Sequence, residues 1–177
     1  WKKNTLHFTL YTLHFTLYTL LFLPINSNAQ VTIACQDFQS NDNGWDQDDG
    51  SRNATNISGS SHSFKLDDGK DAESDLYNFS PYDEVNLTFT FETSGFENGE
   101  TVTVEFDDGS GWVTIATYVA ATDFVNGVDQ TKSLTVLSAD YNFSGYERFR
   151  IRNRANAGND DLYVDDVCVT GYMYCFG

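Results

Sequence analysis

Residues 101–118 read Thr-Val-Thr-Val-Glu-Phe-Asp-Asp-Gly-Ser-Gly-Trp-Val-Thr-Ile-Ala-Thr-Tyr. The first six residues alternate between polar and apolar side chains, which is the two-residue period of a half-buried β-strand. Residues 107–111 are Asp, Gly and Ser, which favour turns, and residues 112–118 return to β-branched and aromatic types. The stretch therefore predicts a β-hairpin.

Similar strand-like runs occupy much of the chain on both sides of this hairpin. They lie at residues 31–39, 63–66, 74–79, 84–93, 100–106, 112–119, 131–137, 146–154 and 160–169. Polar residues 41–61 are predicted to form a long loop, and no convincing amphipathic helix occurs. We therefore predict an all-β fold, an antiparallel β-sandwich of the jelly-roll type.

The N-terminal residues 1–29 have the composition of a secretory leader. Lys2 and Lys3 precede an apolar run that ends at Leu23, and small residues lead up to Ala29. This pattern predicts a signal peptide cleaved after Ala29 and a secreted, extracellular protein, with an uncleaved signal anchor as the alternative. One sandwich domain is expected at residues 30–171, followed by a tail at 172–177 whose abrupt end indicates truncation.

The charge balance narrows the classes of partner. The chain has 26 acidic and 10 basic residues, for a formal net charge of −16. Nucleic acid is excluded as a partner, because its phosphates require a basic surface. Binding of divalent cations fits the balance, although solubility through net charge explains most of it.

Three cysteines, Cys35, Cys168 and Cys175, follow the leader. Disulfides form in exported proteins, and one bridge with one spare thiol is the simplest count. Cys35 lies in the first expected strand and Cys168 in the last. We therefore expect Cys35 to pair with Cys168, with Cys175 as the second choice of partner.

Four carboxylates crowd the run from Asn159 to Val167, which reads Asn-Asp-Asp-Leu-Tyr-Val-Asp-Asp-Val. In a regular strand alternate side chains face opposite sides, so one acid of the Asp165–Asp166 pair must point inward. A buried carboxylate is costly without a compensating cation or donors, and Ca²⁺ selects such hard oxygen ligands.

The sequence therefore predicts a calcium ion as cofactor, held between the first and last strands. Its expected ligands are Asp37, Gln39 and Asp165, with Asp166 and Asp161 as less secure ligands. In the alternative interpretation these acids cap turns and protect an edge strand from aggregation.

Four arginines alternate with apolar residues in the run that begins at Arg148. Arg148, Arg150, Arg152 and Arg154 share one face of the expected strand, while Phe149 and Ile151 face the core. This strip could bind the anionic groups of a carboxylated or sulfated polysaccharide. Alternatively, the arginines pair with acids on a neighbouring strand, such as Glu92 or Glu105.

Aromatic residues offer further ligand contacts, since their rings can stack on sugars, although such residues more often fill a core. Trp45 and Tyr118 are the leading candidates, and the others are Tyr82, Trp112 and Tyr141. In a eukaryotic secreted protein, five Asn-x-Ser/Thr sequons would mark glycosylated surface positions. They begin at Asn53, Asn56, Asn78, Asn86 and Asn142.

Several motifs resemble those of known jelly-roll domains. Residues 35–39 (Cys-Gln-Asp-Phe-Gln), Gly44-Trp45 and residues 164–167 (Val-Asp-Asp-Val) resemble the opening and closing signatures of MAM-type domains. Residues 96–100 (Phe-Glu-Asn-Gly-Glu) and 140–143 (Asp-Tyr-Asn-Phe) look like parts of the non-catalytic jelly-roll modules of Bacteroidetes-type secreted proteins. The resemblance implies a calcium-stabilised module for adhesion or glycan binding. The family generally has an acid where this chain has Gln39, whose amide oxygen can still act as a ligand.

Three functions remain open at this point. The first is a secreted, calcium-stabilised binding module whose partner is an extracellular glycan or a matrix protein. The second is a self-associating filament subunit in which residues 30–34 add a strand to a neighbour's sheet. The third is a hydrolase, which is weakly supported because His62 is the one histidine after the leader. A membrane partner is expected only if the leader is retained.

Overall fold

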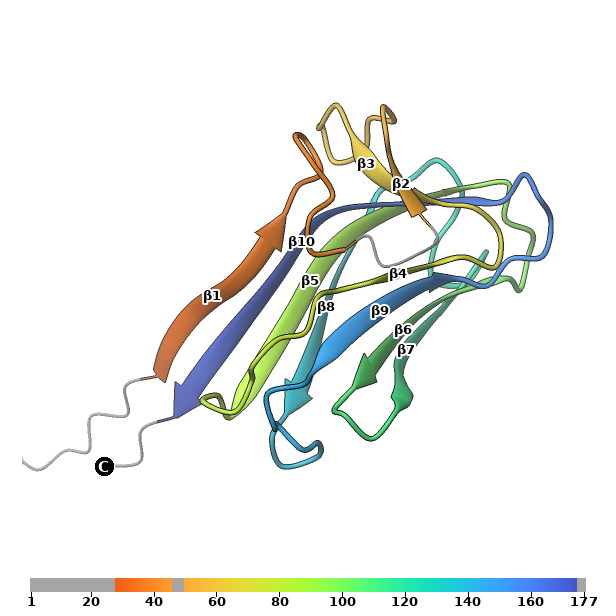
Figure 1. Ribbon diagram of the computed structural model, residues 1–177. Helices are drawn as coiled ribbons and strands as arrows, with labels where there is room; N and C mark the ends of the chain where they lie inside the picture. The colour runs from red at the N-terminus through yellow and green to blue at the C-terminus, as the bar shows by residue number, and fades with distance from the viewer. Residues whose placement is uncertain (1–27, 46–49, 175–177) are drawn as a thin grey trace, which may run out of the picture. The chain divides into compact units, whose positions relative to one another are not determined.

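Two antiparallel β-sheets pack face to face in this computed structural model, which describes residues 28–45 and 50–174 (Figure 1). The strands are β1 (Asn28–Gln36), β2 (Gly50–Asn53), β3 (Ser63–Leu66), β4 (Asp71–Glu73), β5 (Glu84–Ser94), β6 (Thr101–Asp107), β7 (Trp112–Val119), β8 (Gln130–Leu137), β9 (Arg148–Asn153) and β10 (Asp161–Tyr174). Ala29–Met173 form one compact unit. The predicted antiparallel β-sandwich is confirmed.

The first sheet has the order β2-β3-β10-β5-β8, and β1 also pairs with the long strand β10. The second sheet has the order β4-β9-β6-β7. The predicted hairpin is β6 and β7, which pair from Thr101–Val119 to Asp107–Trp112. Ile115 is the extra residue of a bulge in this hairpin, because Val104 pairs with Ala116 and Glu105 with Thr114.

Phenylalanine dominates the core between the two sheets. Phe89 and Phe91, on the apolar side of the β5 alternation, belong to the same core cluster as Phe106 of β6 and Phe149 of β9, and all four rings are fully buried. Burial of one such ring contributes roughly 2–3 kcal/mol. The opposite faces of the same strands carry polar side chains, so alternation fixes which residues can meet a ligand.

Two strands differ from the sequence-based prediction. The run 74–79 forms only an isolated bridge, Tyr77 to Glu147, and the strand next to β9 is the earlier β4. The predicted loop 41–61 contains β2, which pairs with β3. A Cβ on Gly50 would lie 2.2 Å from the ring of Phe64, so glycine lets β2 lie close over this ring.

The expected leader lies mostly outside the described residues. The structure begins β1 at Asn28, so cleavage after Ala29 would remove the first two residues of this strand. Within the described ranges, no helix is long and apolar enough to cross a membrane.

Candidate functional site

The acidic run of β10 contains a bulge that changes where its carboxylates point. Asp165 pairs with Thr90 of β5 while Cys168 pairs with Thr88, so β10 has one extra residue between them. That residue is Asp166, which has a φ of 49°. Asp165 therefore lies on the outer face of the sheet, and the expectation that an acid of this pair faces the interior of the sandwich is wrong.

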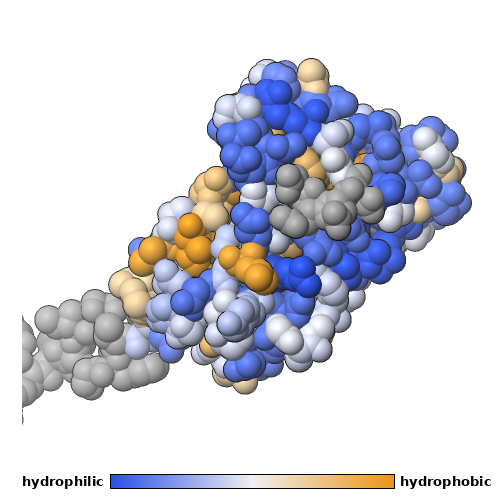
Figure 2. Space-filling view, viewed as in Figure 1, coloured by the Kyte–Doolittle hydropathy of each residue, from blue (hydrophilic) through white to orange (hydrophobic). Residues whose placement is uncertain are grey.

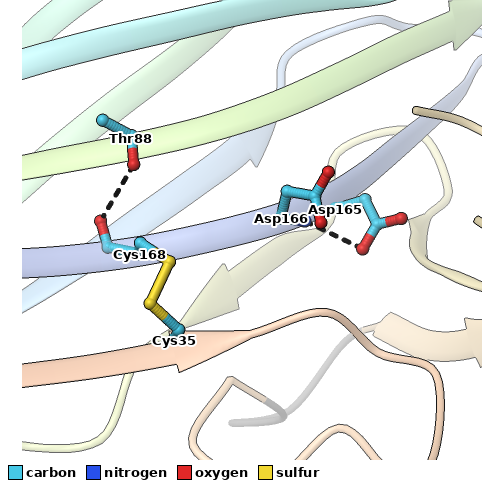
Figure 3. Close-up of a disulfide and its surroundings, with 5 residues drawn as sticks. All are labelled: Cys35, Thr88, Asp165, Asp166 and Cys168. Atoms are coloured by element: carbon cyan, nitrogen blue, oxygen red, sulfur yellow. Dashed lines mark hydrogen bonds between the residues drawn. A yellow bond between two sulfur atoms is a disulfide. The ribbon is translucent and has the colours of Figure 1, made fainter. Parts of the chain in front are cut away.

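Asp165 is nevertheless fully buried, because the loop before β3 covers it. Ser60 Oγ donates a hydrogen bond to Asp165 Oδ2. The Asp166 amide donates to Asp165 Oδ1 at 2.8 Å, as Figure 3 shows. Burial raises the pKa of the Asp165 carboxyl, and these two hydrogen bonds partly offset that effect. Asp166 is exposed and accepts a hydrogen bond from Ser58 Oγ at 2.6 Å.

Asp37 and Gln39 approach the same region, and one oxygen of each accepts hydrogen bonds from the chain. Gln39 Oε1 accepts hydrogen bonds from the amide and hydroxyl of Ser61 at 3.1 and 2.9 Å. Asp37 Oδ1 accepts one from the Gln39 amide at 3.1 Å. The guanidinium of Arg52 donates to the carbonyls of Phe38, at 2.6 Å, and Gln39. The positively charged Arg52 side chain therefore already donates hydrogen bonds to carbonyl oxygens beside the predicted ion position.

Asp161 does not join this group. It lies on β10 before the bulge and pairs with Lys65 Nζ at 3.0 Å. Calcium at the terminal strands stays a prediction, with Asp37, Gln39 and Asp165 as its nearest ligands. The structure does join these strands covalently, by a disulfide between Cys35 of β1 and Cys168 of β10 (Figure 3). Cys175, the alternative partner, lies outside the described residues.

The four arginines of the predicted strip lie on the outer face of the four-stranded sheet, each beside an acid. Arg148 bonds Glu73 and Asp107, and Arg150 bonds Glu73 and Glu105. Arg152 pairs with Asp71 at 3.1 Å, and Arg154 pairs with Glu105 at 3.3 Å. Cross-strand pairing is therefore the interpretation that this face supports.

Glu105 of β6 is the partner that the sequence had suggested, and Glu92 was the wrong choice because it lies on β5 of the other sheet. The indole of Trp112 completes this face. The guanidinium carbons of Arg148 and Arg150 lie 4.7 and 4.1 Å from its ring centroid. These are cation–π distances, so the indole covers the arginines rather than standing free.

A cleft of about 530 Å³ opens at the end of this sheet where β6 turns into β7. Arg148 lies at its edge, and its lining also includes Leu76, Asp107, Asp108, Ser110, Asn142, Ser144 and Tyr146. A second hollow of about 410 Å³ shares Leu76 and Arg148 and adds Ser74 and Asp75. The two side chains of Leu76 and Arg148 therefore lie between two adjoining hollows.

Buried and bonded acids hold the loops of this cleft. Glu147 is fully buried and accepts hydrogen bonds from the amides of Ser144, Gly145 and Phe79, the last two at 2.7 and 2.9 Å. Because Glu147 points inward, its neighbour Tyr146 points outward and is 65% exposed. Asp108 accepts from the Asn142 amide at 3.0 Å, which ties the β6–β7 turn to the β8–β9 loop. Hydrogen bonds from Ser110 and Asn142 lower the pKa of Asp108.

The aromatic residues that the sequence favoured are not on this surface. Trp45 is 2% exposed and belongs to the core, and Tyr118 packs against Phe89 and Phe91 on the inner side of the sandwich. Trp45 is therefore corrected to a core position, and Tyr118 is half-buried against the core. Tyr146 was missed because a lone tyrosine before a strand has no pattern that separates it from a core residue.

The five sequons are spread over several elements. Asn56, Asn78 and Asn142 are exposed, whereas Asn53 and Asn86 are half-buried. Asn142 lines the cleft, so a glycan attached there would obstruct it. His62 is also half-buried, with its Nδ1 2.9 Å from Ser61 Oγ.

No protein-family model matches the chain, and no curated protein matches it in sequence. Solved structures do match its fold. The CBM22-1 xylan-binding domain of Paenibacillus barcinonensis Xyn10C has a TM-score of 0.61 at 8% identity, over 84% of this chain and 99% of that one. The K3 cleaved adhesin domain of Lys-gingipain from Porphyromonas gingivalis has a TM-score of 0.54 at 11% identity, over 80% and 99%.

A third match is the N-terminal CBM22-1 and GH10 modules of Clostridium thermocellum xylanase 10B, solved with xylohexaose. Its TM-score is 0.61 at 18% identity, over 81% of this chain and 29% of that longer one. These likenesses show that the chain shares its β-sandwich fold with carbohydrate-binding and adhesin domains. They do not confirm the narrower resemblance to MAM-type domains.

Proposed function

We propose that this protein is a non-catalytic carbohydrate-binding module whose ligand lies in the cleft beside Arg148. The observation that carries this proposal is the pairing of an exposed aromatic ring, Tyr146, with polar side chains around a preformed hollow. The structural matches to a xylan-binding domain and to CBM22-1 and GH10 modules solved with xylohexaose support it, since they extend over most of the chain.

The chemistry of the lining suits a sugar chain. Tyr146 and Leu76 are 65% and 59% exposed, and they offer apolar surface to the C–H faces of sugar rings. Asp108, Asn142 and Ser144 surround them with acceptors and donors for hydroxyl groups. Binding sites commonly combine apolar surface with a few fixed polar groups in this way.

The charge balance of the site favours a neutral glycan. The guanidinium of Arg148 already bonds to Glu73 and Asp107, so it is not free to bind an anion. Asp108 adds a further negative charge to the lining. A carboxylated or sulfated polysaccharide, which the arginine strip alone would have predicted, would therefore be repelled.

Titration calorimetry with xylohexaose and other neutral oligosaccharides tests the proposal, with polygalacturonate as the carboxylated ligand. We expect binding of a neutral ligand and at least tenfold weaker binding in Tyr146→Ala, a loss of about 1.4 kcal/mol or more. Val125→Ala is the matched control, because Val125 is 54% exposed on the β7–β8 loop, away from the cleft. Preference for polygalacturonate, or unchanged affinity in Tyr146→Ala, would refute the proposed site.

Extracellular location is a further part of the proposal. The Cys35–Cys168 disulfide supports it, since such bonds persist mainly in oxidising compartments. The surface in Figure 2 is largely hydrophilic, with hydrophobic colour over and beside β1. Assembly into filaments is the second candidate function. Assembly by exchange of β1 between subunits would require β1 to separate from β10. The disulfide holds these two strands together.

A further inference from the structure

Three carboxylates that the proposed function does not use converge at one end of the sandwich. Glu97, Glu100 and Asp160 each place an oxygen within 4.8 Å of the others. The two glutamates lie in the loop from β5 to β6, and Asp160 lies just before β10 in the loop from β9. Both loops cross from one sheet to the other at the right-hand end of Figure 1.

Asp160, a member of this group, has one carboxylate oxygen without a hydrogen-bond donor among the described residues. Its side chain is fully buried, and Oδ2 accepts a hydrogen bond from the Ala157 amide at 2.9 Å. Oδ1 is buried without any hydrogen-bond donor among the described residues. A buried carboxylate oxygen without a donor among the described residues is costly, and a bound cation would compensate this cost.

Gly95 makes room for this oxygen. It has a φ of 88°, and a Cβ there would lie 2.7 Å from Asp160 Oδ1 and 2.4 Å from the carbonyl oxygen of Asn159. Any side chain at this position would therefore press on Asp160. The end of β5 approaches the acidic turn closely only because residue 95 is glycine.

Glu100 is oriented by its own hydrogen bonds. Its Oε1 accepts bonds from the amide and side chain of Asn156 at 3.0 and 2.7 Å, and its Oε2 accepts one from the Glu97 amide at 2.8 Å. Glu100 is 8% exposed whereas Glu97 is exposed, so the group is open to solvent on the Glu97 side.

Cationic side chains of the described residues do not neutralise the group. Across residues 28–45 and 50–174, none of the three carboxylates forms an ion pair with Lys or Arg. By contrast, every arginine of β9 has an acid beside it.

We propose that Glu97, Glu100 and Asp160 bind a Ca²⁺ ion that ties the β5–β6 loop to the β9–β10 loop. Calcium takes oxygen ligands at about 2.3–2.6 Å, so two of its ligands lie at most about 5 Å apart, which the three oxygens satisfy. Mg²⁺ needs shorter distances and near-octahedral geometry, so it fits less well. Water completes the coordination on the exposed side of Glu97.

Thermal unfolding of the whole domain in excess EGTA or in Ca²⁺ tests this site. For Ca²⁺ at a hundredfold excess over its Kd, we expect the wild-type Tm to rise by roughly 5–10 °C. Asp160→Asn should abolish that rise and should not lower the Tm in EGTA, because the amide removes a buried, uncompensated charge. Asp165→Asn is the matched control, since Asp165 is equally buried but has donors on both oxygens, and it should keep the full calcium response.

Glu97→Gln provides a second test at an exposed position, where folding is not at risk. It should weaken calcium binding at least tenfold in a titration followed by the same Tm shift. The proposal is overturned if wild-type protein gains no stability from Ca²⁺, if Asp160→Asn and Glu97→Gln respond as wild type does, or if Mg²⁺ acts as strongly as Ca²⁺.

Discussion

Asp160 and Asp165 lie five positions apart in the chain, both are fully buried, and their surroundings are opposite. Each oxygen of Asp165 accepts a hydrogen bond, from Ser60 Oγ or the Asp166 amide. Asp160 lies beside two glutamates, and one of its oxygens accepts a hydrogen bond from Ala157. Its Oδ1 has no donor within residues 28–45 and 50–174. Burial of an acid alone therefore does not predict a cation site. The hydrogen-bond donors around its oxygens are the better guide.

The partners of each side chain also distinguish the arginine face of the four-stranded sheet from the cleft at its end. Four arginines and four acids on the outer face of the four-stranded sheet neutralise one another, so that this face is an ion-pair lattice rather than an anion site. The cleft at the end of this face has exposed groups that a ligand can contact, above all the ring of Tyr146. Ligand binding is expected where side chains lack internal partners.

Removal of the Cys35–Cys168 disulfide, which lies near Asp165, should lower the stability more than any other change predicted here. Cys35→Ser combined with Cys168→Ser opens a link over a sequence separation of 133 residues, which should cost roughly 4–5 kcal/mol of unfolding free energy. Urea denaturation measures this loss, and wild type in reductant should match the variant. A loss below about 1 kcal/mol, or its recovery in Ca²⁺, would show that the terminal strands are held by an ion instead.

Replacing Arg52 should produce the next largest effect. Arg52→Met keeps much of the apolar stem but removes the donors to the carbonyls of Phe38 and Gln39, which should cost about 2 kcal/mol. Arg154→Met is the control, because the Arg154 side chain is 43% exposed and its single ion pair should contribute less than about 1 kcal/mol. If Ca²⁺ restored the stability of Arg52→Met alone, an ion could replace the guanidinium, and the contrast with Asp160 would weaken.

The pH dependence of Asp165→Asn should give the smallest effect. Burial raises the pKa of Asp165 in the folded protein, so the folded state holds this proton more tightly than the unfolded state does. Wild-type stability should therefore fall as the pH rises from the ordinary range of aspartate, about 3.9, through the raised pKa. The difference in urea midpoint between variant and wild type should grow in the variant's favour over that range. A constant difference would mean that Asp165 titrates normally.

Local patterns predicted the strands well where alternation is regular. The hairpin of β6 and β7 and the arginine face of β9 followed from a period of two, because no long-range contact is needed to see which residues share a face. The bulge at Asp166 broke this logic, since one inserted residue reverses the facing of everything after it. No feature of the Asp165–Asp166 pair marks the bulge in advance.

The two candidate sites were harder to predict because each depends on tertiary contacts. Glu97 and Asp160 are distant in the sequence and meet only because two sheet-crossing loops lie at one end of the sandwich. Tyr146 is exposed only because the buried Glu147 organises the turn before β9. Sequence alone predicted calcium at Asp37, Gln39 and Asp165, and it could not show that Arg52 donates to the neighbouring carbonyls.

An anomalous difference map from crystals grown in CaCl₂ would test the contrast between the two buried aspartates most directly. The structure predicts a calcium peak among Glu97, Glu100 and Asp160, within about 2.6 Å of Asp160 Oδ1, and none beside Asp165. A peak ligated by Asp37, Gln39 and Asp165, with no density at Asp160, would contradict the account.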